Sequence, residues 1–158
     1  MPNALVCYYS RTGNTKRLAV RMAEVLAAEG LEVDLRTVQE TSPKDLLRYD
    51  CLILGSPTYY GTMAWEMKKL LDESVRFHGK LRGKVGAAFT SSANIGGGNE
   101  TTVLDILHAL LIHGMIVHVD HRFDHYAPVS IGRPDKRSLD CCEAHAKNLA
   151  VLTKKLFP

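Results

Sequence analysis

A short apolar run passes through a loop of small polar residues into a helical pattern, and this junction constrains the fold more than any other stretch. Ala4 to Tyr9 is typical of a buried strand. After the loop, one helical face carries Leu18, Ala19, Met22, Val25 and Leu26. A loop so placed leaves free backbone N–H groups at the positive end of a helix dipole, which stabilises anions. The sequence therefore predicts a phosphate site at Ser10, Arg11, Thr12, Gly13, Asn14 and Thr15.

These residue types also have a second explanation, which the sequence leaves open. Ser, Thr, Asn and Gly are favoured at any strand-to-helix junction because they cap helices and allow tight turns. If the loop does bind phosphate, the class of ligand is narrow. No Gly-Lys-Ser/Thr sequence closes the loop as a P-loop requires, and Gly13 lacks the partner glycines of a dinucleotide fingerprint. We therefore expect a mononucleotide.

Length and composition indicate one globular domain, which we expect to cover 1–158. A chain of 158 residues can bury a sizeable core but is short for two ordinary domains. No signal-peptide pattern precedes the first strand and no apolar run reaches membrane-spanning length, so we expect a cytoplasmic protein without a membrane partner. The net charge of +3 is unclustered, which does not indicate a nucleic-acid partner.

The rest of the chain alternates between strand and helix patterns. Four further strands are predicted, at 31–36, 51–54, 85–91 and 115–119, and helices at 64–75, 100–113 and 139–156. Only the 31–36 segment has the alternation of a half-exposed edge strand. The prediction is an α/β fold with a doubly wound five-stranded parallel sheet, order 2-1-3-4-5, and helices on both faces. Ligands then bind at the carboxyl ends of the first and third strands.

The helix at 100–113 has apolar residues on nearly all of its faces. A helix of that kind is buried all round. An outer helix of a small domain reaches such burial most simply at a subunit interface. We therefore expect a homo-oligomer, either a dimer or a tetramer.

Three loops converge on the expected ligand crevice, at 10–15, 56–62 and 92–99. The first suits a phosphate, the second offers two tyrosines and a glycine, and the third offers amides, hydroxyls and bare backbone. Together they are the set that flavin mononucleotide (FMN) requires. A phospho-acceptor receiver domain has the same strand order but needs carboxylates where this chain has Tyr9-Ser10 and Gly55-Ser56.

The sequence resembles the flavodoxin-like superfamily through YYSRTGNTKRLA, and resembles the WrbA type of NAD(P)H:quinone oxidoreductase through SPTYYGTMAWEMKKLLD and GGGNETTVLDILHALLIHGM. The resemblance covers about 4–156. It implies that the 10–15 loop binds the FMN phosphate. It also implies a flavin-contacting histidine at His113. The residues that it places around the isoalloxazine ring are Pro57, Thr58, Tyr59, Tyr60, Gly61, Ser92, Ala93, Asn94, Ile95, Gly96 and Gly97.

The chain departs from the WrbA pattern at two points near the expected nicotinamide site. Thr12 replaces a frequent tyrosine, and Tyr59-Tyr60 replaces the usual Arg-Phe pair. The connectors after the second and fifth strands are also shorter than in that type, where such segments help to build a tetramer. These departures bear on NAD(P)H use and assembly more than on FMN binding.

Two classes of function fit such a site, an enzyme that passes two electrons and a carrier that passes one. A one-electron carrier benefits from negative charge around the flavin, whereas none of the three loops contains Asp or Glu. The charge balance therefore favours an oxidoreductase that passes two electrons from NAD(P)H to a quinone-like acceptor by a ping-pong mechanism. A flavodoxin-type carrier and an FMN-binding module with little turnover remain alternatives.

No side chain of the protein is predicted to act as a catalytic group, because the flavin would supply the chemistry. His118, His121 and His125 have the composition of a metal site. His121 and His125 lie in the predicted loop at 120–137 and His118 lies in the predicted strand at 115–119. No single strand or helix aligns the three, so we expect no metal.

Overall fold

Five parallel strands run in the order β2-β1-β3-β5-β6 and form the body of the sheet. The structure is a computed structural model that describes residues 1–158. The strands are β1 (Asn3–Tyr8), β2 (Glu32–Thr37), β3 (Cys51–Tyr59), β5 (Val85–Ser92) and β6 (Ile116–Val117). This order confirms the predicted doubly wound sheet, with β2 at one edge.

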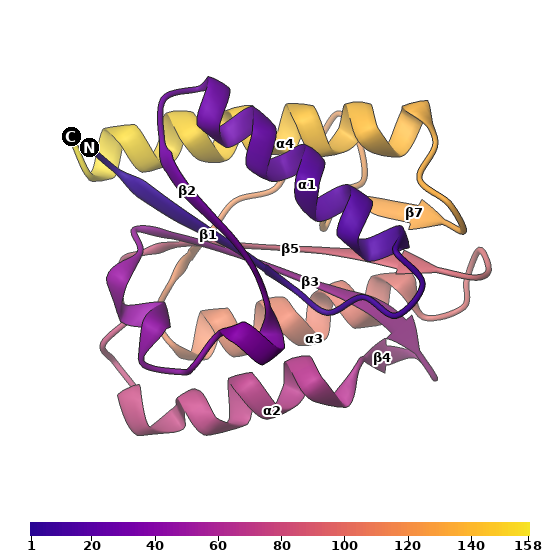
Figure 1. The fold of residues 1–158 in the computed structure, drawn as a ribbon, viewed down its shortest axis with the longest axis horizontal. Coiled ribbons are helices and arrows are strands. Elements are labelled where there is room, and N and C mark those ends of the chain that lie inside the picture. The colour runs from indigo at the N-terminus through magenta and orange to yellow at the C-terminus, as the bar shows by residue number, and fades with distance from the viewer.

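Helices cover both faces of the sheet (Figure 1). On one face α1 (Asn14–Ala28) lies beside α4 (Lys136–Leu156), and on the other α2 (Trp65–Glu73) lies beside α3 (Asn99–Ile112). Each face has a hydrophobic cluster of 19 buried residues, because β1, β3 and β5 send alternate side chains to opposite sides. None of the helices is long and apolar enough to cross a membrane.

The fifth predicted strand is split, which corrects the expectation of one strand at 115–119 and a loop at 120–137. β6 pairs only with Val85 and Gly86 at the start of β5. The chain then leaves the sheet, and β7 (Val129–Ile131) pairs in parallel with the end of β5, from Thr90 to Ser92. β6 and β7 therefore form hydrogen bonds with different parts of the same edge of β5.

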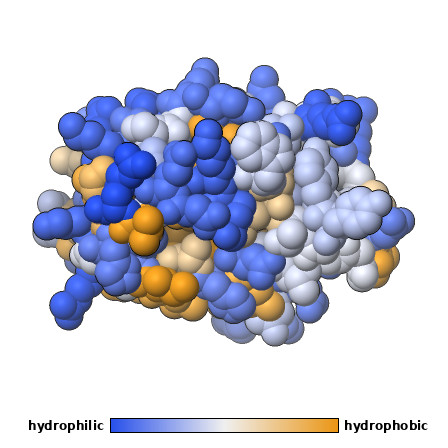
Figure 2. All heavy atoms as spheres, turned by 90° about the horizontal axis from the view of Figure 1, so that it is seen from below, coloured by the Kyte–Doolittle hydropathy of each residue, from blue (hydrophilic) through white to orange (hydrophobic).

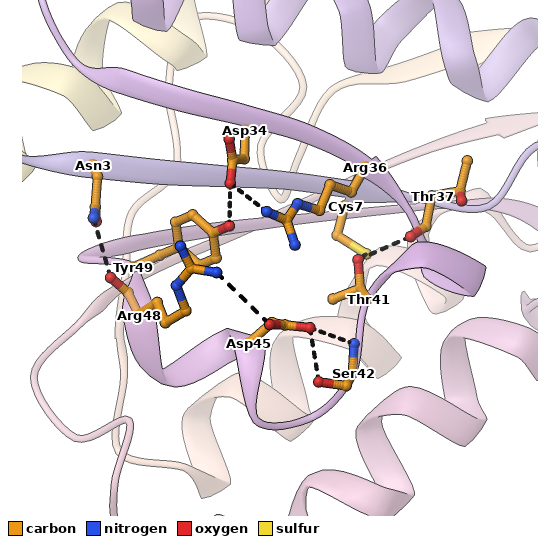
Figure 3. A network of polar contacts seen from close by, with 10 residues as sticks. All are labelled: Asn3, Cys7, Asp34, Arg36, Thr37, Thr41, Ser42, Asp45, Arg48 and Tyr49. Atoms are coloured by element: carbon orange, nitrogen blue, oxygen red, sulfur yellow. Dashed lines mark hydrogen bonds and ion pairs between the residues drawn. The ribbon is translucent and has the colours of Figure 1, made fainter.

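The connection between β2 and β3 is held by a polar network (Figure 3). The connection contains two short 3-10 helices, η1 (Val38–Glu40) and η2 (Asp45–Arg48). The Asp34 carboxylate accepts hydrogen bonds from the hydroxyl of Tyr49 and, at 2.8 Å, from Arg36. The Tyr49 bond lowers the pKa of Asp34, and burial and then Asp34 raise the pKa of Tyr49 to about 12. The network ties the edge strand to the connection.

A buried histidine of α4 makes the fold sensitive to acid. His145 is 1% exposed, its Nε2 has no hydrogen-bond partner, and its ring lies 6.4 Å from that of His118. Burial, with His118 second, lowers the pKa of His145 to about 4, while Asp120 acts in the opposite direction. The unfolded chain therefore binds a proton at a pH where the folded chain does not.

Stability should consequently fall as the pH drops from about 6.5 towards 4. From pH 7 to pH 5 we expect the free energy of unfolding to decrease by about 2 kcal/mol through His145. Urea denaturation at both pH values measures the effect, and His145→Gln should remove most of it. An undiminished pH dependence in His145→Gln would assign the effect to other groups.

Candidate functional site at the carboxyl edge of the sheet

The loop at 10–13 is folded around the Ser10 side chain. Its hydroxyl oxygen accepts hydrogen bonds from the backbone N–H of Gly13 at 3.1 Å and of Lys16 at 3.3 Å. Gly13 precedes α1 with a φ of 98°, a left-handed conformation that glycine adopts without steric cost. The loop is anchored to the sheet because Thr15 shares a 2.8 Å hydrogen bond with Ser91 of β5.

Four backbone N–H groups of the segment 10–15, which we call the anion loop, have no acceptor within the protein. They belong to Arg11, Thr12, Asn14 and Thr15. The last two are the first residues of α1, so they lie at the positive end of its dipole. Free donors in this position form a ready site for an anion such as phosphate.

The predicted loop at 56–62 is in fact a β-hairpin. β3 continues through Pro57 and Thr58 to Tyr59, and a short antiparallel strand, β4 (Thr62–Met63), turns back against it. Proline is tolerated because β1 has already ended, at Tyr8 opposite Gly55, so this part of β3 has a parallel neighbour on one side only. Residues 56–59 were predicted as loop because apolar periodicity ends at Leu54.

The hairpin presents its aromatic residues at the surface. Tyr60 and Gly61 form the turn with φ angles of 47° and 82°, the geometry of a two-residue hairpin turn. The Tyr60 side chain is fully exposed, and the Tyr59 ring packs edge-on against Tyr9 with centroids 6.4 Å apart. A tyrosine in the left-handed region is uncommon and is typical of functional sites.

The third loop lies beside the hairpin. Ser92 ends β5, Ala93, Asn94, Ile95, Gly96 and Gly97 are exposed, and Gly98 precedes α3. A Cβ atom added to Gly98 would overlap the backbone of Gly61, so the two backbones are in close contact. Thr101 at the start of α3 fixes the contact, because its hydroxyl donates to the carbonyl oxygen of Gly61. The three predicted loops therefore meet at one edge, on the right in Figure 1.

The predicted flavin contact of His113 stays a prediction, and within one chain His113 lies apart from these loops. It caps the C-terminal end of α3, and the loop at 92–98 leads into the N-terminal end. A 14-residue helix is about 21 Å long, so the two lie at opposite edges of the sheet. His113 is buried, shares a 2.8 Å hydrogen bond with Ser74, and has its pKa lowered by burial and by the nearby His78.

The sequence did not single out two other features of this edge. Thr58 and Thr90 share a hydrogen bond of 2.9 Å on one face of the sheet, and the Thr15–Ser91 bond lies on the other face, because Thr90 and Ser91 are successive residues of β5. In the sequence, these hydroxyl groups were indicated by the Thr-Ser-Ser run at 90–92, at the end of the fourth predicted strand. One carboxylate also lies close by, since Glu66 contributes, after burial, to raising the pKa of Tyr9.

A parallel sheet in this strand order, with helices on both faces, defines a doubly wound α/β protein. The chain belongs to the flavodoxin domain family, whose model matches residues 5–105. A flavodoxin of Aquifex aeolicus is 38% identical over 95% of this chain and 86% of its own length. An NAD(P)H dehydrogenase (quinone) of Archaeoglobus fulgidus is 32% identical over 99% of this chain and its whole length.

Solved structures share the fold closely. The crystal structure of a WrbA-like flavodoxin from Agrobacterium tumefaciens superposes with a TM-score of 0.83, at 24% identity, over 98% of this chain and 99% of that one. A flavodoxin from the domain Archaea has a TM-score of 0.81 at 25% identity and covers 96% of this chain and 99% of its own. The relatives thus include proteins named flavodoxin and proteins named NAD(P)H dehydrogenase (quinone).

The contact between Gly98 and Gly61 gives a test of the site architecture. Gly98→Ala should lower the free energy of unfolding by roughly 1–3 kcal/mol more than Gly13→Ala, because only the first side chain overlaps a neighbouring backbone. Both glycines immediately precede a helix with nearly the same φ, 103° and 98°, so the conformational cost is matched. Urea denaturation of the two variants measures the difference. Equal losses would show that the hairpin and the loop can separate freely.

Proposed function

We propose that this protein binds FMN at the carboxyl edge of its sheet and passes two electrons from NAD(P)H to a quinone-like acceptor. The observation that carries the first part is the set of four unpaired N–H groups at the start of α1. The second part is supported by relatives named NAD(P)H dehydrogenase (quinone), at 32 to 39% identity. The overall reaction is NAD(P)H, a proton and a quinone going to NAD(P)⁺ and a quinol.

The residues at this edge fit the parts of FMN. The N–H groups of the 10–15 loop would hold the phosphate, and the hydroxyl of Thr58, which Thr90 positions by a hydrogen bond, would offer a partner for the polar chain that follows it. Tyr59 and Tyr60 would flank the isoalloxazine, and the exposed backbone of 93–97 would offer hydrogen bonds to its polar rim. When bound, FMN supplies the redox chemistry, since its ring takes up and gives back two electrons.

The protein contributes binding, orientation and charge to the reaction. Because the hairpin tip and the 93–97 segment are exposed, a planar donor could approach the site from solvent. We propose that NAD(P)H and the acceptor occupy this open side in turn, which is a ping-pong cycle. The three loops hold no carboxylate and include Arg11, so developing negative charge at the site meets no repulsion from them.

FMN and riboflavin differ only by the phosphate, which isolates the role of the 10–15 loop. We expect the protein to bind FMN at least about 100-fold more tightly than riboflavin, because the phosphate accepts several charge-assisted hydrogen bonds. Titration followed by flavin fluorescence gives both dissociation constants. Similar constants would mean that the loop serves only to cap α1.

The donor is tested by mixing FMN-saturated protein with NADH or NADPH without oxygen. We expect at least one nucleotide to bleach the visible absorbance of the flavin rapidly, and a quinone added afterwards to restore it. Steady-state plots at several quinone concentrations should give parallel lines. Intersecting lines would exclude the ping-pong cycle. Bleaching by a protein reductase but by neither nucleotide would favour the carrier, the second candidate that the relatives named flavodoxin support.

We also propose that the protein forms a homo-oligomer through the face of α2 and α3. The sequence predicted that α3 would be buried all round, but within one chain Leu111 and Ile112 are 54% and 71% exposed. Val75, after α2, is 69% exposed, and Figure 2 shows orange side chains gathered on this face. A second copy would remove this apolar surface from water.

A further inference from the structure

A groove of about 530 Å³ lies beside the anion loop, between the first turns of α1 and the segment that leads into α4. Its lining includes Gly13, Lys16, Arg17, Val20, Pro134 and Leu139. Gly13 belongs both to this groove and to the anion loop. The groove therefore opens directly onto the edge where we place the flavin.

The charge in the groove is positive and largely uncompensated. Lys16 and Arg17 are exposed, and neither forms an ion pair. Arg21 and Glu24 also line the groove, but they pair with each other at 3.8 Å, and Arg21 also pairs with Glu143. Two further cations without an ion pair are close to lining residues in the chain: Arg133 directly precedes Pro134, and Arg11 is two residues before Gly13. A surface of this kind attracts an anion strongly at ordinary ionic strength.

The apolar part of the groove restricts the kind of anion. Val20, Pro134 and Leu139 are half-buried and come from both walls. Apolar surface next to two free cations suits a ligand that joins a flat apolar group to a phosphate, as a nucleotide does. A free phosphate would leave this apolar surface unused.

We propose that the groove binds the adenosine 2′-phosphate end of NADPH and so selects NADPH over NADH. The inference rests on the proposed function for its biological meaning, since it names the nucleotide that the enzyme would use. A phosphate monoester carries about two negative charges at neutral pH and accepts bidentate hydrogen bonds from arginine. The 2′-hydroxyl of NADH offers Lys16 and Arg17 neither charge nor these acceptors.

Binding of nucleotide fragments tests the groove without turnover. FMN-saturated protein, in excess FMN so that the anion loop is filled, is titrated calorimetrically with 2′,5′-ADP and with 5′-AMP. We expect 2′,5′-ADP to bind at least about tenfold more tightly, because one or more charge-assisted hydrogen bonds are gained. Equal affinities, or no binding of either fragment, would overturn the assignment.

A matched pair of arginine variants locates the site. Arg17→Gln should weaken binding of 2′,5′-ADP by about tenfold. The control is Arg76→Gln. Arg76 is also exposed and without an ion pair, but it follows α2 on the opposite face of the sheet. This variant should leave the affinity for 2′,5′-ADP unchanged. If Arg17→Gln binds 2′,5′-ADP as the unaltered protein does, the 2′-phosphate is not held in this groove.

The enzyme assay separates this inference from the proposed function. In steady state, Arg17→Gln should lower kcat/KM for NADPH about tenfold relative to kcat/KM for NADH. If neither nucleotide reduces the flavin, the proposed oxidoreductase is wrong, and the 2′,5′-ADP titration alone decides the groove. If both reduce it at equal kcat/KM, the oxidoreductase stands and the selection of NADPH is wrong.

Discussion

The pairing of β3 with β5 is the interaction on which the site depends. The two strands stay in register from Cys51 opposite Val85 to Pro57 opposite Ser91, whereas β1 stops at Tyr8. Both strands are buried on their two faces, so the hydrophobic clusters on either side fix this register. Gly55 shows how close the packing is, because a Cβ atom there would overlap the ring of Phe89. The strands therefore project past β1 and carry the hairpin and the 92–98 loop at one level.

The proposed anion site of the 10–15 loop depends on N–H donors that the protein leaves without an acceptor. Ser10 accepts hydrogen bonds from two N–H groups and the Thr15 side chain anchors the loop to β5, while four N–H donors stay unpaired, two of them on the exposed residues Arg11 and Thr12. Exposed donors cost little in the free protein because water satisfies them. A bound anion would replace that water and accept hydrogen bonds from donors that the fold already holds in place, which lowers the entropic cost of binding. The loop conformation therefore costs little free energy without a ligand, and it needs little further ordering to bind an anion.

The fold class and strand order could be predicted because long apolar runs and helical periodicity carry them. β4 and β7 could not, since strands of two and three residues have no period and depend on partners far away in the chain. The three loops were predicted to meet because parallel strands place their carboxyl ends at one edge. The predicted flavin contact of His113 rests on the resemblance alone, and within one chain the 14 residues of α3, at about 1.5 Å each, separate His113 from that edge.

Whether its charged side chains form ion pairs, rather than the net charge of the protein, determines how this surface interacts with charged molecules. The excess of three positive charges is small, yet Arg11, Lys16, Arg17 and Arg133 all lie unpaired near the start of α1 and the segment before α4. Acidic residues of α2 and α3, such as Asp72 and Asp105, are on the opposite face of the sheet. The cations beside the anion loop repel the basic surfaces that acidic carriers dock on, and they attract small phosphorylated ligands. For the proposed oxidoreductase, these unpaired cations favour a nucleotide, rather than a basic protein, as the electron donor.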